Sequence, residues 1–173
     1  MARASRDQGT LDAVDRIVEQ WRREVPDLDP TAKGVTGRII RLRTLIGDRF
    51  ADDAFGPHGL NGGDYGILAA LRRAGAPYEL TPTELTRQQM VTSGGMTAML
   101  DRLERRGLVE RVPNPNDRRG SLVRLTTDGR RTVEAAMASH AEAEQAVVSA
   151  LTARERDQLS DLLRKLLLAL EPA

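Results

Sequence analysis

Apolar residues recur every three or four positions through most of the chain, which is the period of amphipathic helices. The first such run predicts a helix with Thr10 as its cap and with apolar positions Leu11, Val14, Ile17 and Trp21. A second helix is predicted to open at Asp29-Pro30, because proline is favoured in the first helical turn, and to end before Gly56-Pro57. Its apolar positions are Val35, Ile39, Leu42, Leu45 and Phe50.

Further helices are predicted in the middle of the chain. One spans about residues 63–74, and Gly75 to Pro77 end it. The sequence TPTE places Thr81 and Glu84 three residues apart, which is the pattern of a capping box. It predicts a short helix that ends near Val91.

Two short runs after these helices are typical of strands, LVERV (108–112) and SLVRL (121–125). Between them lies PNPNDRRG (113–120), in which two prolines, two asparagines and a glycine predict a loop. A tight hairpin needs about two loop residues, so this connection is expected to be a longer loop with charged residues at its tip.

Two more helices are predicted at the end of the chain. Thr126 is expected to cap a long helix that runs through Val148, and a second capping box, TARE (152–155), is expected to start the last helix. The last helix carries an apolar stripe made of Leu159, Leu162, Leu163, Leu166, Leu167 and Leu170. Periodicity does not separate packing within the monomer from packing between two copies. Because a terminal helix has few other elements to cover it, we expect Leu159, Leu163, Leu166 and Leu167 to lie at a homodimer interface.

The predicted order in the centre is helix, short helix, turn, helix, strand, charged loop, strand. This order defines a winged helix-turn-helix, in which the second helix of the pair lies in the major groove of DNA. The chain is therefore predicted to be mainly α with a small β-hairpin wing. We expect double-stranded DNA as its partner.

The helix over residues 92–107 is the predicted recognition helix, and it is expected to end at Gly107. Its first turn combines small hydrogen-bonding side chains with glycines that let the backbone come close to DNA: Thr92, Ser93, Gly94, Gly95 and Thr97. Either Thr92 or Ser93 is expected to be the cap. The alternative is that Ser-Gly-Gly forms nothing more than a loop and a helix cap.

The loop 113–120 is the predicted wing. Arg118 and Arg119 are expected to enter the adjacent minor groove, because its negative potential attracts arginine. A carboxylate does not suit DNA, so Asp117 is predicted to orient a neighbouring guanidinium instead. The alternative is a solvated charged turn.

Composition narrows the class of protein. The 173 residues include no cysteine, which excludes disulfides and thiol chemistry, and His58 and His140 are too far apart to suggest a metal site. No apolar run is long enough for a membrane span and no signal peptide is evident, so a cytoplasmic location is expected. The net charge is only +1, but seven arginines and four acidic residues lie between Asp101 and Leu125.

Other classes of function have less support in the sequence. No motif of a nucleophilic, phosphate-binding or metal-dependent enzyme is present, so no catalytic residue and no cofactor is predicted. A winged-helix module that binds a protein partner rather than DNA is the alternative function. The wing arginines and the glycine-rich start of the recognition helix argue against that alternative.

From about Leu60 to Gly129 the chain resembles the MarR family of transcriptional regulators. The matching sequences are LAALRRAG (68–75), LTPTEL (80–85), MVTSGGMTAMLDRLERRGLVER (90–111) and DRRGSLVRLTTDG (117–129). The resemblance implies a ligand-responsive repressor that acts as a homodimer on a pseudo-palindromic operator. It also implies that Arg118 and Arg119 belong to the wing, with Asp117 bracing it.

This resemblance suggests a division of the chain into functional parts. Residues 1–173 are expected to form a single domain, with an extra N-terminal helix over 10–25 and the winged helix-turn-helix over 60–125. The helices over 30–55 and 127–173 are expected to serve dimerisation.

The extra first helix is similar to that of the urate-responsive, PecS-like branch of the family. The resemblance implies four urate-binding positions, which fall on Trp21, Arg111, Gly66 and Met99. Trp21 and Arg111 match the branch, whereas Gly66 stands for an aspartate and Met99 for an arginine. Asp64 is two positions from Gly66, about 200° round a helix, so it is expected to point elsewhere.

These departures argue against urate and favour a small-molecule effector that is partly apolar. Trp21 has an alternative role as a core residue, and Arg111 has alternative partners in Glu110 and DNA phosphate.

Overall fold

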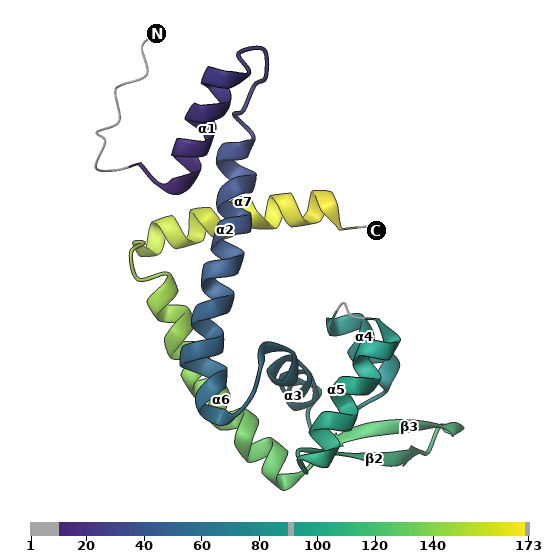
Figure 1. Ribbon diagram of the computed structural model, residues 1–173. Helices are drawn as coiled ribbons and strands as arrows, with labels where there is room; N and C mark the ends of the chain where they lie inside the picture. Colours follow the sequence, from purple (N-terminus) through teal and green to yellow (C-terminus); the bar gives the residue numbers. More distant parts are fainter. Residues whose placement is uncertain (1–10, 90–91, 172–173) are drawn as a thin grey trace. The chain divides into compact units, whose positions relative to one another are not determined.

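A computed structural model describes residues 11–89 and 92–171, apart from the side chains of residues 118 and 119. The chain divides into two compact units, Met1–Asp48 and Arg49–Ala173. The described part of the first unit holds the helices α1 (Ala13–Glu24) and most of α2 (Lys33–Arg49). The second unit is mainly helical, with one small sheet beside its helices (Figure 1).

Helix α1 is capped by Asp12 rather than by Thr10, which lies outside the described residues. The Asp12 carboxylate accepts hydrogen bonds from the backbone N–H groups of Val14, at 2.7 Å, and Asp15, at 2.9 Å. Asp15 completes a capping box. The sequence did not predict it, because the pair is Asp-x-x-Asp and the usual pattern is Ser or Thr followed by Glu or Gln.

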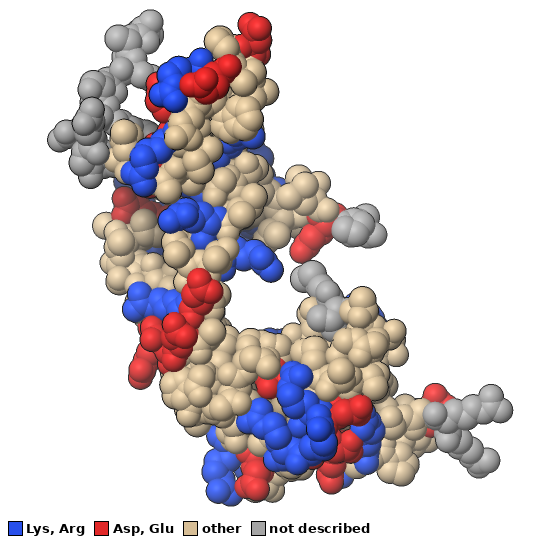
Figure 2. Space-filling view, viewed as in Figure 1, with Lys and Arg blue, Asp and Glu red and all other residues tan. Residues whose placement is uncertain are grey.

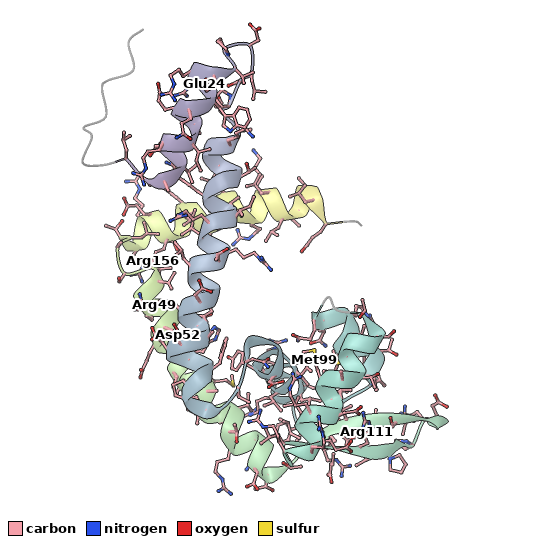
Figure 3. The ribbon with its side chains drawn as sticks, in the orientation of Figure 1. Glu24, Arg49, Asp52, Met99, Arg111 and Arg156 are labelled. Atoms are coloured by element: carbon pink, nitrogen blue, oxygen red, sulfur yellow. The ribbon has the colours of Figure 1, made fainter. Side chains whose placement is uncertain are left out.

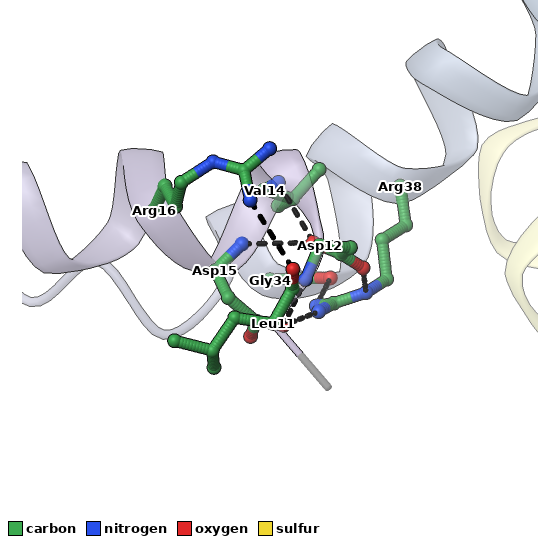
Figure 4. A network of polar contacts seen from close by, with 7 residues as sticks. All are labelled: Leu11, Asp12, Val14, Asp15, Arg16, Gly34 and Arg38. Atoms are coloured by element: carbon green, nitrogen blue, oxygen red, sulfur yellow. Dashed lines mark hydrogen bonds and ion pairs between the residues drawn. The ribbon is translucent and has the colours of Figure 1, made fainter. Parts of the chain in front are cut away.

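The helices α1 and α2 are joined by an ion pair next to an apolar contact. The Arg38 guanidinium on α2 lies 2.8 Å from both the Asp12 and the Asp15 carboxylate (Figure 4). The hydrogen bond from Arg38 is the largest cause that lowers the pKa of Asp15 below its ordinary range. A Cβ atom on Gly37 would lie 3.0 Å from the Val14 side chain, so the two helices approach closely there.

Helix α2 begins at Lys33, and the prediction that it opens at Asp29-Pro30 is wrong. The Asp29 carboxylate accepts a hydrogen bond from the Thr31 backbone N–H at 2.9 Å. This local bond stabilises a turn in place of the first helical turn. At Arg49 the chain continues as the π-helical segment η2 (Phe50–Phe55), which is followed by the short 3-10 segment η3 (Gly56–His58).

The second unit contains the predicted central helices. After η2 and η3 come α3 (Gly62–Arg73), β1 (Glu79–Leu80), α4 (Pro82–Gln89), α5 (Ser93–Arg105), β2 (Val109–Asn114), β3 (Asp117–Leu125), α6 (Thr127–Val147) and α7 (Ala153–Leu170). The capping box before α4 is confirmed, because the Thr81 backbone N–H donates to the Glu84 carboxylate at 2.7 Å and the Glu84 N–H donates back to the Thr81 hydroxyl at 3.2 Å. Gly107 closes α5 with a positive φ of 69°, which glycine adopts without strain.

The core of this unit lies where α3, α4, α5 and α6 meet the sheet. Its largest fully buried apolar side chains are Ile67, Leu68, Leu71, Leu85, Met96, Leu103, Val123 and Val133. Gly129 near the start of α6 lies against the Leu108 carbonyl, and a Cβ atom there would be 1.8 Å from that oxygen. This packing fixes the start of α6 behind the strands.

The sheet has the order β1-β3-β2 and is antiparallel throughout. The prediction of a long loop over 113–120 is wrong, because Pro113 pairs with Ser121 and Asn114 pairs with Asp117. Proline is tolerated there since β2 is an edge strand. A register shift between Pro113 and Asn114 lets the pairing continue, so two residues form the turn. The two-residue strand β1 was also missed, being too short to leave a pattern.

The two C-terminal helices begin where the sequence predicts. Thr126 caps α6, and Thr152 and Glu155 form the capping box of α7. The leucine stripe of α7 is exposed in this chain: Leu159, Leu162, Leu163, Leu166, Leu167 and Leu170. Among the described residues no helix is long and apolar enough to cross a membrane.

Candidate DNA-binding interface

Helix α5 buries one face and exposes the other at its N-terminal end. Met96, Leu100 and Leu103 are buried against the rest of the unit. Thr92 is the cap, and its hydroxyl accepts a hydrogen bond from the Gly95 backbone N–H at 3.2 Å. The burial of one face therefore orients the start of α5 toward solvent, as the sequence predicts for a recognition helix.

The exposed end of α5 carries the predicted contact residues. Thr92, Ser93, Gly94 and Thr97 are exposed, and Gly95 is half-buried. The Thr97 hydroxyl donates to the Ser93 carbonyl at 3.1 Å, which leaves the hydroxyl oxygen as an acceptor. No atom of the described residues lies within 4 Å of the position of a Cβ on Gly94, so the described part of the protein does not require glycine there.

The hairpin β2–β3 stands beside α5, and Arg111 links the two. The Arg111 guanidinium donates to the Asp101 carboxylate of α5 at 2.5 Å and also to Glu104. The hydrogen bond to Asp101 is the largest cause that raises the pKa of Arg111. Glu110, which the sequence suggested as a partner of Arg111, pairs with Arg124 instead.

The wing tip is described in part. Asp117 is exposed, and its carboxylate lies over the backbone of Gly120, where a Cβ atom would be 2.8 Å from the nearer oxygen. The side chains of Arg118 and Arg119 lie outside the described part, so the bracing of the wing by Asp117 stays a prediction.

Basic side chains gather over the region of α5 and β2, with acidic side chains beside them (Figure 2). Arg102, Arg106 and Arg111 are all engaged by carboxylates. Some arginines of this segment therefore join elements of the protein rather than contact DNA. The sequence alone does not distinguish these two roles.

Asp64 is the charged residue that is buried among the described residues, with 2% of its surface exposed. It lies in the first turn of α3, and its carboxylate accepts from Arg102 Nη2 at 2.5 Å and from Arg106 Nη1 at 3.4 Å. The prediction that Asp64 points away from Gly66 is consistent with these contacts. Its role in joining α3 to α5 was missed, although an acidic residue just before the apolar run ILAAL could have signalled a buried partner.

Three positions of the predicted effector site, Gly66, Met99 and Arg111, belong to the second unit. Gly66 faces α4, where a Cβ atom would overlap the Gln89 side chain, and Met99 faces α3, where its methyl group would lie 2.7 Å from a Cβ on Gly63. Figure 3 shows Met99 on the side of α5 toward α3. These contacts bring the two positions to the junctions of α3 with its neighbours, whereas Arg111 is engaged at the hairpin.

Trp21 belongs to the N-terminal unit and lines a pocket there. The pocket has a volume of about 480 Å³ and lies between α1 and α2, with Ile17, Trp21, Lys33, Ile40 and Arg41 in its walls. Lys33 Nζ lies 5.2 Å from the centre of the indole ring, and Trp21 is 40% exposed. The alternative that Trp21 is a core residue is therefore wrong for this chain.

The described residues hold no group of three or more side chains that could bind a metal ion. The geometry that is present, a helix pair with an exposed recognition helix and a two-stranded wing, defines a winged helix-turn-helix protein.

Comparisons with known proteins identify the family to which the chain belongs. Residues 58–120 match the model of the MarR family. The chain is 37% identical over 150 residues to the HTH-type transcriptional regulator PecS of Dickeya dadantii, a match that covers 87% of this chain and 90% of PecS. The chain belongs to the MarR family of transcriptional regulators.

Solved structures agree with this assignment. A mutant MarR from E. coli in complex with operator DNA matches with a TM-score of 0.69 and 32% identity, over 85% of this chain and 97% of that one. Bordetella bronchiseptica BpsR, described as regulated in its DNA binding by 6-hydroxynicotinic acid, matches with a TM-score of 0.67 and 26% identity, over 77% of this chain and 98% of that one.

Proposed function

We propose that this protein is a repressor that binds an operator in double-stranded DNA and releases it when a small molecule binds. The observation that carries the proposal is the exposed start of α5, whose opposite face is buried, beside the β2–β3 wing. The operator complex of the E. coli relative supports the choice of DNA over a protein partner.

In this function α5 reads the major groove. Ser93 and Thr97 supply hydroxyl groups for base edges, and the N-terminus of a helix such as α5 suits a phosphate. Because Gly94 has no side chain, the DNA backbone can approach α5 closely at this position. This accounts for a glycine at a position where the described part of the protein does not require one. Arg118 and Arg119 reach the minor groove from the wing.

A second copy of the chain completes the DNA-binding form. The leucine stripe of α7 is exposed, with Leu163 at 38% and Leu167 at 56%, and an apolar face of this length is costly in water. Pairing of two such faces would place two copies of α5 on the half-sites of a pseudo-palindrome.

The effector is proposed to be a partly apolar small molecule. BpsR is described as regulated in its DNA binding by 6-hydroxynicotinic acid, which supports a small molecule as the effector. Trp21, Gly66, Met99 and Arg111 remain the proposed positions, with Gly66 and Met99 supplying an uncharged surface. No catalytic residue is proposed, and the characterised relatives act as regulators.

A mobility-shift titration tests the proposal. The DNA next to the protein's own gene and an unrelated duplex of equal length are titrated at the same salt concentration, because affinity for DNA depends strongly on salt. Tighter binding to the first duplex supports an operator-binding regulator. Equal and weak binding to both would favour the alternative, a winged-helix module for a protein partner.

A further inference from the structure

We infer that Asp64 is a positioning residue for DNA recognition, which sets the orientation of the recognition helix α5 through Arg102 and Arg106. This inference rests on the proposed function and adds a residue that does not touch DNA. The three side chains are called the Asp64 cluster below.

The Asp64 cluster joins two elements that are far apart in the sequence. Arg102 Nε and Nη2 lie 3.2 and 2.5 Å from the same Asp64 oxygen, and Arg106 Nη1 lies 3.4 Å from the other. The two arginines are four residues apart, so they project from one face of α5 onto a single carboxylate. Two guanidinium groups on one carboxylate restrain both the tilt and the rotation of α5 relative to α3.

The surroundings make Asp64 the fixed point of this cluster. It lies in the first turn of α3, where the helix dipole favours an acidic side chain, and its own N–H donates to Asn61 at 2.9 Å. The side chains of Arg102 and Arg106 are 38% and 35% exposed, so they reach inward from the surface. Asp64 is thus the buried member of the cluster, and the two arginines are its partly exposed partners.

The apolar packing of α5 does not supply the same restraint. Met96 and Leu100 hold the helix against the core, but apolar contacts are not directional, and a helix can slide or roll on them. Between α3 and α5, Met99 lies beside Gly63, and a flexible methionine next to a glycine gives little resistance to rotation. The apolar face therefore decides which side of α5 meets solvent, and the directional contacts of Asp64 adjust the tilt and rotation that place Ser93 and Thr97.

The consequence for DNA binding is specific. A base contact requires its side chain within a few tenths of an ångström, whereas phosphate contacts tolerate a shift. Loss of the Asp64 cluster should reduce preference for the operator and leave attraction to any DNA in place. A residue that merely stabilised the fold would change the fraction of folded protein and not this preference.

The test compares three variants of the full chain. Asp64→Asn keeps the shape and removes the charge, and the triple variant Asp64→Leu, Arg102→Met, Arg106→Met replaces the whole cluster with apolar groups. Replacing a complete buried ion cluster is often neutral for stability, so the triple variant is expected to fold even if Asp64→Asn does not. Asp128→Asn, which removes an equal charge from an exposed pair on α6, is the matched control.

Affinity for the operator and for an unrelated duplex is measured for each variant, together with thermal unfolding and the salt dependence of binding. The affinity for the operator divided by that for the unrelated duplex should fall about tenfold in Asp64→Asn and in the triple variant, which is the effect of one lost base contact. In Asp128→Asn this ratio should stay within about twofold of the unmodified protein.

A ratio that is unchanged in both Asp64 variants overturns the inference. If Asp64→Asn folds and keeps its preference, a loss confined to the triple variant also overturns the inference, because the arginines would then act on DNA without Asp64. Failure of the proposed function is a separate result, since the unmodified protein would then show no preference between the two duplexes.

Discussion

The Arg111 guanidinium on β2 lies 2.5 Å from the Asp101 carboxylate on α5. A second carboxylate, that of Glu104 one turn along the same helix, accepts from the other terminal nitrogen of Arg111. The wing and the recognition helix are therefore tied by one side chain. Two carboxylates already neutralise the charge of Arg111, so an anionic ligand would compete with them for this guanidinium.

Urate is expected to bind this protein at least tenfold more weakly than a protein with an aspartate at 66 and an arginine at 99. Charged hydrogen bonds contribute roughly 1.5–3 kcal/mol each, and Gly66 and Met99 provide neither. Trp21 is the single tryptophan of the chain, so its fluorescence reports on the first helix during a urate titration.

The Gly66→Asp, Met99→Arg double variant is the comparison for this prediction. The aspartate side chain introduced at position 66 has room only if the flexible Gln89 side chain moves, because a Cβ on Gly66 would lie 2.2 Å from Gln89 Oε1. A Gln89→Ala background removes that obstacle. Tight binding of urate to the unmodified protein, with release of the operator, would contradict the prediction.

The wing is expected to add affinity that does not depend on DNA sequence. Arg118→Ala with Arg119→Ala should weaken binding to operator and unrelated DNA alike, and the slope of log affinity against log salt should decrease by about 0.9 for each lost phosphate contact. Arg131→Ala with Arg164→Ala removes the same charge from exposed pairs on α6 and α7 and serves as control. Equal slopes in the wing variant and the unmodified protein would exclude contact between the wing and DNA.

Thr97 is expected to affect specificity more than total affinity. Thr97→Val keeps the shape of the side chain and removes the hydroxyl, which donates to the Ser93 carbonyl and leaves an exposed acceptor. Operator binding should weaken by about 1–3 kcal/mol if the hydroxyl contacts a base, with little change for unrelated DNA. Titrations of both duplexes measure the difference, and an equal loss on both would place base readout elsewhere.

The stripe on α7 is expected to hold the dimer. Leu163→Arg should give a folded monomer in sedimentation, because this side chain is exposed in the single chain and the arginine would be buried without a partner only in the dimer. Leu168→Arg is the matched control, since Leu168 lies about 180° from the centre of the stripe and is 72% exposed. A Leu163→Arg protein that remains a dimer would show that this face does not form the interface.

Acid is expected to weaken the start of α4 through Glu84. The hydrogen bond from the Thr81 backbone N–H lowers the pKa of Glu84 below its ordinary value of 4.5. A lowered pKa in the folded state means that this contribution is fully present above pH 4.5 and is lost as the pH falls through the folded-state value. Glu84→Gln retains a cap that does not titrate, so its unfolding free energy should decline less between about pH 5 and pH 3.

Denaturant unfolding at several pH values checks this prediction. Glu142→Gln on an exposed position of α6 is the control for the loss of a glutamate. Identical pH profiles for Glu84→Gln and the unmodified protein would refute the role of the capping box.

The sequence determined the features that depend on neighbouring residues. The caps at Thr81, Thr126 and Thr152 are visible in the sequence because the donor and the acceptor of each lie within three residues. The order of helices and strands, and from it the winged helix-turn-helix, was predicted for the same reason. The starts of α1 and α2 were predicted wrongly near Asp12 and Asp29. At both places an aspartate side chain bonds to the backbone nearby, and such local bonds can form either a helix cap or a turn.

Tertiary structure alone decided which charged residues are used inside the protein. Asp64 and Arg102 are 38 residues apart, and nothing in the pattern of either segment identifies the other as its partner. The same holds for Arg111, whose partners lie on α5, and for the wing, where pairing across β2 and β3 replaced the expected loop. An arginine in a sequence has the same charge whether it faces DNA or a carboxylate. Its role is fixed by which surfaces the folded core brings together, because a hydrogen bond depends on distance and direction in space.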